Sequence, residues 1–149
     1  MLKKTTILTL ILPIAVLFTL TECTFETSDN GDLDGYWQLT AIDTLATAHT
    51  ADMRHSGIYW AVQVRLLLIR DVTVNSPNVL FRFEKTAETL TISNPVIDER
   101  DVSDIKVENP DILHPYGIYR LKETFRILQL DSQSMVLENQ DFRMHFRKY

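Results

Sequence analysis

The chain has 149 residues, and its 20 acidic side chains outnumber 15 lysines and arginines, which gives a formal net charge of −5. This length allows one domain of ordinary size, and an acidic chain without a basic stripe is not expected to bind nucleic acid. The chain contains only 4 glycines and no G-x-S-x-G motif or phosphate-binding loop, so an enzyme is not expected.

The first segment has the layout of a secretory signal. Lys3 and Lys4 precede an almost wholly apolar stretch, residues 7–20, which is interrupted by Pro13. Signal peptides have this order, with basic residues first, then an apolar run and then a cleavage site. A membrane-spanning helix is the alternative, but such a helix needs ~20 predominantly apolar residues. Because no basic residue follows closely to hold a spanning helix in place, a cleaved signal over residues 1–22 is favoured.

The only cysteine of the chain ends this apolar segment, so it cannot form a disulfide within the chain. Leu20, Thr21, Glu22 and Cys23 resemble the lipobox of bacterial lipoproteins, in which the signal is cut before a cysteine that receives a diacylglycerol. Glu22 departs from the pattern, because a small residue is usual there. The resemblance implies a lipid anchor at Cys23. Each buried acyl CH2 contributes ~0.8 kcal/mol, and two or three chains give stable anchoring.

A polar, acidic stretch over residues 23–34 is expected to serve as a tether. It has too few apolar side chains to offset the entropy lost on ordering. An Asn-x-Asp-x-Asp spacing that starts at Asn30 opens like a calcium loop. The twelfth position of that loop would be Ala41, where a bidentate glutamate is needed, so no calcium site is expected.

Residues 35–149 are expected to form one domain built from short strands. Apolar and polar side chains alternate over residues 36–41 with the period of two that indicates a strand. No stretch makes a persuasive amphipathic helix, and residues 44–55 are the best candidate for a single short one. The domain is therefore predicted to be all-β.

A longer strand is predicted over residues 57–71. Its even positions are all apolar as far as Leu68, and they include Trp60. Aromatic and β-branched residues also favour a strand over a helix. Leu67 and Ile69 break the alternation near the end of the run. Either both faces are covered there, or a bulge shifts the register.

A hairpin and a closing meander are predicted in the second half of the chain. Residues 78–85 and 88–93 each alternate, and the turn between them is short enough for a hairpin. The last part, residues 124–149, reads as three antiparallel strands. The turns between these strands, residues 131–133 and 139–140, contain Asp, Ser and Asn, which are common in turns.

The segment between the hairpin and the meander, residues 94–117, has little regular pattern. Long loops of compact domains tend to be functional or disordered. If the strands close into a barrel, this loop is expected to roof one mouth of it. The entrance would then be framed by this loop and by the connection over residues 44–57. Its carboxylates, within residues 98–111, match no spacing known for calcium binding or acid–base catalysis. A solvated loop is therefore the preferred interpretation of this acidic segment.

A resemblance to a known family rests on the first and last strands. Many short strands joined by tight turns suggest an antiparallel barrel or sandwich, and closure removes the exposed edges. Gly35, Tyr36 and Trp37 look like the G-x-W of lipocalins, and the closing segment resembles the last strands of small lipocalin-like lipoproteins of Gram-negative bacteria. The resemblance implies an up-and-down barrel of about eight strands with an interior ligand site. It also implies a basic residue stacked over Trp37, for which Arg143 and Arg147 are the candidates, although the period of two turns both outward.

One group of possible metal ligands lies in the first connection. His49, Asp52 and His55 would share one face of a helix loosely, and histidine with aspartate can bind zinc. No fourth ligand is visible, so a solvated loop is preferred. No metal, other cofactor or catalytic residue is predicted for the chain.

We therefore interpret the chain as a lipoprotein of the cell envelope, anchored through Cys23 and expected at the outer membrane, on its periplasmic or surface face. Its expected partner, besides the membrane, is a small hydrophobic ligand bound inside the barrel. The residues predicted to line that site are Trp37, Trp60, Phe81 and Phe83. The alternative is a filled barrel that acts as a protein–protein interaction module in an envelope complex. An internal cavity would favour the first interpretation, and an exposed apolar patch the second.

Overall fold

The structure is a computed structural model that describes residues 28–98 and 105–149. The predicted signal over residues 1–22 and the predicted lipid anchor at Cys23 lie outside the described residues. Within the described residues no helix is long and apolar enough to cross a membrane.

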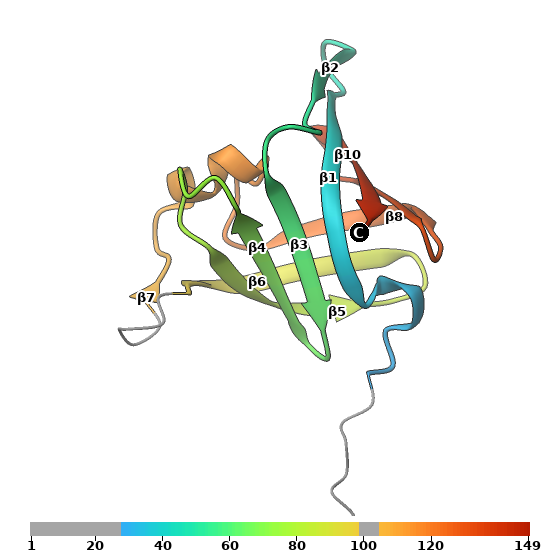
Figure 1. Cartoon of the computed structure of the whole chain (residues 1–149), viewed down its shortest axis with the longest axis horizontal. Coiled ribbons are helices and arrows are strands. Elements are labelled where there is room, and N and C mark those ends of the chain that lie inside the picture. Colours follow the sequence, from blue (N-terminus) through green and yellow to red (C-terminus); the bar gives the residue numbers. More distant parts are fainter. Residues whose placement is uncertain (1–27, 99–104) are drawn as a thin grey trace, which may run out of the picture.

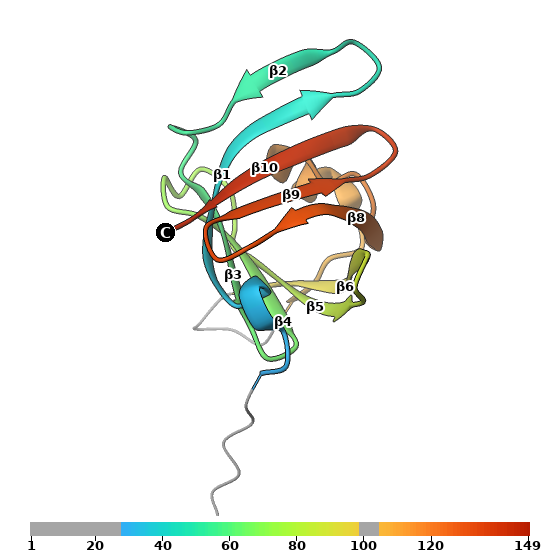
Figure 2. The ribbon, with the colours of Figure 1, turned by 90° about the vertical axis from the view of Figure 1, so that its right-hand side faces the viewer.

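Eight antiparallel strands form a closed barrel (Figures 1 and 2). The strands are β1 (Gly35–Thr44), β3 (Ile58–Gln63), β4 (Leu66–Asp71), β5 (Val79–Lys85), β6 (Thr89–Ile97), β8 (Glu123–Leu130), β9 (Ser134–Glu138) and β10 (Phe142–Lys148). Each pairs with the next in this order, and β10 pairs with β1 to close the barrel. Two short strands, β2 (His49–Asp52) and β7 (Ile105–Lys106), extend the sheet beyond it. The up-and-down, eight-stranded, all-β barrel predicted from the sequence is confirmed.

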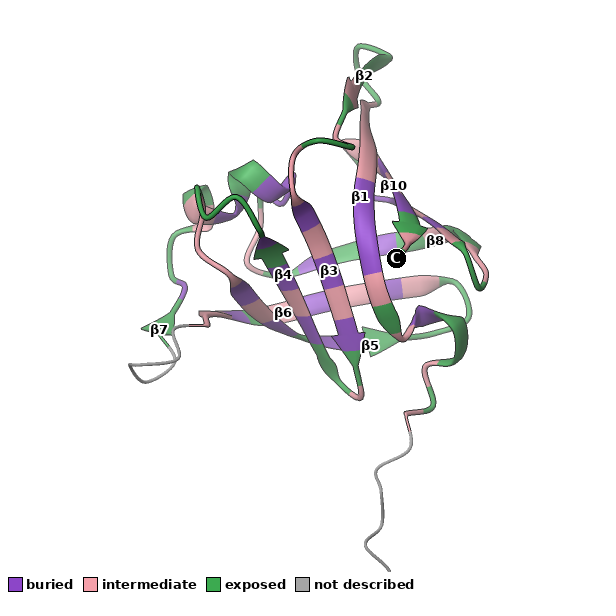
Figure 3. Cartoon of the chain, viewed as in Figure 1, coloured by how far each residue is buried: buried purple, intermediate pink, exposed green. Residues whose placement is uncertain are grey.

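The core lies inside the barrel because side chains alternate along each strand. In β5, Val79, Phe81 and Phe83 are buried, while the residues between and after them are half-buried or exposed. In β10 the buried positions are Met144 and Phe146. Figure 3 shows the buried bands repeating along neighbouring strands. These inward side chains form one continuous hydrophobic cluster.

The run over residues 57–71 is two strands, so the expectation of a single strand is wrong. Val64 and Arg65 form a two-residue turn between β3 and β4. Such hairpin turns need a positive φ, and Val64 has φ 55°, which is unusual for a β-branched residue. Because of this turn, the inward-facing residues have even numbers in β3 and odd numbers in β4. Leu67 is therefore buried in β4, while Leu66 is exposed on the outside.

Residues 44–55 form a β-hairpin and not the expected short helix. β3 pairs only with residues Gly35–Gln38 of β1. The rest of β1 therefore has no barrel strand on the edge that would face β3. β2 fills this edge, with Ile42 opposite Ala51 in the register. Pairing of the backbone groups of β1 thus decides the conformation. Figures 1 and 2 show the hairpin projecting beyond the barrel, so it is not the mouth-framing loop that was expected.

One end of the barrel is covered by the short 3-10 helix η1 (Gly31–Leu33). Leu33 has no exposed surface, and its carbonyl accepts a hydrogen bond of 2.8 Å from Nε1 of Trp37. Residues 28–34 therefore pack against the barrel, although the sequence pattern predicted a tether there. The N-terminal segment is part of the closed end.

The opposite end is covered by the 3-10 helix η2 (Pro110–Tyr116) (Figure 1). Leu113 and Tyr116 are fully buried, and the hydroxyl of Tyr116 donates to the carbonyl of Pro77. Burial, with the Asp71 carboxylate nearby, raises the pKa of Tyr116 to about 12. The phenol therefore stays protonated and able to donate at neutral pH. The described part of the segment 94–117 roofs this end, as the sequence predicted.

Candidate functional site

The four residues predicted to bind a ligand lie in the core of the barrel. Trp37, Trp60 and Phe81 have no exposed surface, and Phe83 is 6% exposed. A void that holds a water molecule has walls with accessible surface, so the first three side chains line no such void. The barrel is filled around them by its own side chains. Ligand binding at these residues stays a prediction, and it would require core side chains to move aside.

Trp60 lies at the centre of an aromatic group. Its ring centroid lies 4.7 Å from that of Phe146 and 6.0 Å from that of Phe125. Its indole Nε1 is buried, and no atom of residues 28–98 or 105–149 accepts a hydrogen bond from it. Trp60 therefore stabilises the barrel through packing, and a buried donor without an acceptor reduces that benefit.

The residue stacked over Trp37 is Lys148, so the candidates Arg143 and Arg147 are wrong. Nζ of Lys148 lies 4.7 Å from the centroid of the Trp37 ring, and it donates to the carbonyl of Asp32 at 2.8 Å. Trp37 and Lys148 are direct partners in the pairing of β1 with β10. The period of two that turns both arginines outward turns Lys148 inward, and this signal was present in the sequence.

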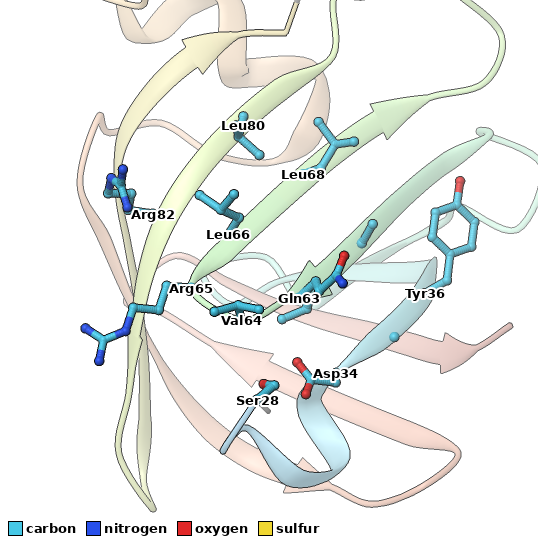
Figure 4. Close-up of a pocket in the computed structure, with 13 residues that line it drawn as sticks. Ser28, Asp34, Tyr36, Gln63, Val64, Arg65, Leu66, Leu68, Leu80 and Arg82 are labelled. Atoms are coloured by element: carbon cyan, nitrogen blue, oxygen red, sulfur yellow. The ribbon is translucent and has the colours of Figure 1, made fainter. Parts of the chain in front are cut away.

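A groove of about 1060 Å³ lies on the outside of the barrel (Figure 4). Strands β1, β3, β4 and β5 form it, together with the β3–β4 turn and residues Ser28 and Asp34 of the segment before β1. The apolar residues that line it are Tyr36, Ala61, Val62, Val64, Leu66, Leu68 and Leu80, of which Val62 turns its side chain into the core. Its polar residues are Ser28, Asp34, Gln63, Arg65 and Arg82.

An apolar row crosses four strands in this outer groove. Tyr36 is opposite Ala61, Ala61 is opposite Leu68, and Leu68 is opposite Leu80 in the registers of the strand pairs. Residues directly opposite on one face of a sheet are in contact distance. Leu66 adds an exposed leucine beside the row, with 40% of its surface accessible. We call Tyr36, Ala61, Leu66, Leu68 and Leu80 the outer apolar row.

Tyrosines extend the outer apolar row along β1 and β3. The rings of Tyr36 and Tyr59 are stacked with centroids 4.9 Å apart. The ring of Tyr149 meets both of them edge-on, at 6.1 and 5.6 Å. Together they cover more of the outer face with rings that have an apolar body and a polar tip.

Arginines flank the row on the side away from Tyr36 (Figure 4). Arg65 and Arg82 are both exposed, and neither takes part in an ion pair within the described residues. The N-terminal segment is fixed beside them, because Nδ2 of Asn30 donates to the carbonyl of Val64 at 2.8 Å. The groove thus combines apolar side chains, free guanidinium groups and the segment that precedes β1, residues 28–34.

Comparison with known proteins identifies the family. Residues 17–149 match the family model described as a lipocalin-like domain. The chain belongs to the lipocalin-like family. Among solved structures, it is similar to a lipocalin-like protein from Bacteroides uniformis, with a TM-score of 0.61 and 20% identity over 80% of this chain and 100% of that one. It is also similar to an uncharacterized protein from Bacteroides eggerthii, with a TM-score of 0.54 and 16% identity over 78% and 98% of the two chains.

No curated protein matches the chain. The two structural likenesses support the lipocalin-like fold alone, because the identities are low. The family match confirms the resemblance that the first and closing strands carry in the sequence.

The glycine of the lipocalin-like G-x-W motif makes room for Lys148. Gly35 has φ +121°, and a Cβ there would lie 2.9 Å from Cε of Lys148. We expect Gly35→Ala to lower the free energy of unfolding by about 2–3 kcal/mol, from backbone strain and displacement of the lysine from Trp37. Urea denaturation measures the change.

Gly31→Ala is the matched control for this prediction. Gly31 also has a positive φ, +59°, but nothing lies within 4 Å of an added Cβ. Backbone strain alone should then cost about 1 kcal/mol. Equal losses in Gly35→Ala and Gly31→Ala would contradict the contribution of Lys148.

The possible zinc ligands do not form a site in the lipocalin-like structure. His49 and Asp52 lie three residues apart in β2, which puts them on opposite faces of the strand. Hydrogen bonds from Arg54 hold the pKa of the Asp52 carboxyl well below its usual range. In the part of the chain that the structure describes, no three histidine, cysteine or acidic residues are grouped to bind a metal ion.

Proposed function

We propose that this lipocalin-like protein is held by a lipid at Cys23 on a membrane of the cell envelope, and that it acts by binding a partner in the outer groove. The observation that supports this is the contrast between the two faces of the barrel. The interior side chains Trp37, Trp60 and Phe81 leave no accessible surface, whereas the outside of β4 exposes leucine. Of the two interpretations of the sequence, the contrast supports the filled barrel that binds on its outside over the carrier of an interior ligand.

The position of the N-terminal segment supports a role for the anchor in this binding. Ser28, the first described residue, lines the groove. The stretch from Cys23 to Ser28 spans at most ~17 Å when fully extended. A lipid on Cys23 would therefore keep the groove close to the membrane surface. The outer membrane, on its periplasmic or surface face, is the proposed location.

Replacing Cys23 by alanine tests the anchor. The variant is expected to leave the membrane fraction, because the acyl chains that hold the protein are lost. The wild-type protein from that fraction should have the intact mass of residues 23–149 plus its acyl chains. Thr24→Ala is the control, which should remain membrane-bound. A Cys23→Ala protein that stays in the membrane through an uncut segment 1–22 would contradict the proposal.

A further inference from the structure

We infer that the partner of the outer groove is the bilayer itself, with the outer apolar row among the acyl chains and the neighbouring arginines among the lipid phosphates. This inference rests on the proposed lipid anchor at Cys23. It adds a second, non-covalent membrane contact and gives the anchored barrel one orientation on the surface.

The charge of the groove face differs from that of the chain. The whole chain has a net charge of −5, but the charged residues on the outside of β4 and β5 and in the β3–β4 turn are mostly basic. They are Arg65, Arg70, Arg82 and Glu84. At the rim of the groove, the Asp34 carboxylate accepts a hydrogen bond of 2.7 Å from Asn30 Nδ2. Guanidinium groups bind phosphate well, and basic residues near an anionic membrane are attracted to its surface.

The apolar residues of the face suit the membrane interface. Leu66, Leu68 and Leu80 project from neighbouring strands into one groove (Figure 4). Stacked Tyr36 and Tyr59 adjoin them, and tyrosine is enriched at the level of the lipid headgroups, where its ring is buried and its hydroxyl is hydrated. Leucines flanked by arginines and tyrosines form the pattern of a surface that enters the headgroup region.

The location of the anchor brings this face to the membrane. Asn30 binds the carbonyl of Val64, so the N-terminal segment is fixed to the β3–β4 turn that carries Arg65. The stretch from Cys23 to Ser28 limits the distance between a lipid on Cys23 and the groove to ~17 Å. The exposed end of β4 is thus among the first parts of the barrel to meet the bilayer, whereas the β1–β2 hairpin lies at the far end (Figures 1 and 2).

A fluorescent label at two matched positions tests the inference. Leu66→Cys and Leu45→Cys place a thiol at residues of equal exposure, 40% and 39%, in the groove and in the β1–β2 turn. Each mature, lipidated protein is labelled with the environment-sensitive dye NBD in vesicles of phosphatidylethanolamine and phosphatidylglycerol. Lipids with spin-labelled acyl chains should quench the dye at position 66 several-fold more than the dye at position 45. Arg65→Glu with Arg82→Glu should reduce the quenching at position 66.

The wild-type protein separates failure of the anchor from failure of the inference. A lipidated Cys23 has no free thiol, so the wild type should take up no dye. Dye uptake by the wild type would overturn the anchor, and the inference with it. Equal quenching at the two positions, with an unlabelled wild type, would overturn the inference alone. A dye at position 66 that a water-soluble quencher reaches in vesicles, but does not reach in native envelopes, would overturn the inference and assign the groove to a protein partner.

Discussion

Replacing Trp60 by alanine is expected to lower the free energy of unfolding by ~3–5 kcal/mol, as other large aromatic truncations in cores do. Trp60 is fully buried and packs on Phe125 of β8, on the opposite side of the barrel, and on Phe146 of β10, which is two strands away. Alanine would leave a cavity that these rings cannot fill without shifting their strands. Urea denaturation, followed by circular dichroism, gives the change.

Tyr59→Ala is the matched control for Trp60→Ala, because Tyr59 is the preceding residue of β3 and faces outward, half-buried. It should lose about 1 kcal/mol or less, since surface substitutions have small effects. Trp60→Phe should also lose less than Trp60→Ala, because most ring contacts remain and no hydrogen bond within the described chain is lost. A Trp60→Ala protein within ~0.5 kcal/mol of the wild type would contradict the filled core.

Replacing Trp37 by alanine is expected to cost a similar ~3–5 kcal/mol, and for a further reason. Besides its burial, Trp37 donates to the carbonyl of Leu33 and supports Lys148. The variant leaves that buried carbonyl without its donor, which adds a penalty. The covering segment η1 should therefore exchange its amide hydrogens faster in Trp37→Ala than in Trp60→Ala, and mass spectrometry can follow this exchange.

Lys148→Ala removes only the contact of the ammonium group with the Trp37 ring and with the Asp32 carbonyl. It should cost ~0.5–2 kcal/mol, the usual range for a cation–π pair. If Trp37→Ala costs no more than Lys148→Ala, Trp37 does not act as a core residue, and the role assigned to the G-x-W motif is contradicted.

The closing meander was predictable because its signals are local. Asp131 accepts hydrogen bonds from the backbone amides of Gln133 and Ser134, and Asn139 accepts from those of Asp141 and Phe142. These side chains stabilise the two turns through neighbours in the sequence. The alternating strands between them then pair without any information from distant parts of the chain.

The β3–β4 turn was not predictable from turn chemistry. Val64 and Arg65 lack the glycine or asparagine that usually accompanies a two-residue hairpin turn. Pairing of β3 with β4, and of β4 with β5, outweighs the local strain at Val64. The β1–β2 hairpin has a similar cause, because the edge of β1 beyond β3 determines the conformation of residues 44–55.

The candidate site was only partly predictable for the same reason. Alternation placed Trp37, Trp60, Phe81 and Phe83 correctly on the inner face. It could not tell whether the inner face surrounds a cavity, which depends on how all eight strands fill the barrel. The outer groove was missed because the β3–β4 turn exchanges inward and outward positions. A single strand over residues 57–71 would turn Leu66 and Leu68 into the core, whereas the turn places them on the outside. Four consecutive apolar residues, 66–69, were the available signal that both faces of this strand carry apolar side chains.

The central claim is that the barrel is filled and that binding takes place outside it. Trp37 and Trp60 are the 2 tryptophans of the chain, and both are fully buried in the core. Tryptophan emission of the purified protein therefore reports on the interior. Titration with a panel of fatty acids and retinoids is predicted to give no saturable change in this emission. Saturable quenching by one of these ligands that is lost in Phe83→Arg, with the fold of the variant intact by circular dichroism, would contradict the claim and place the binding site inside the barrel.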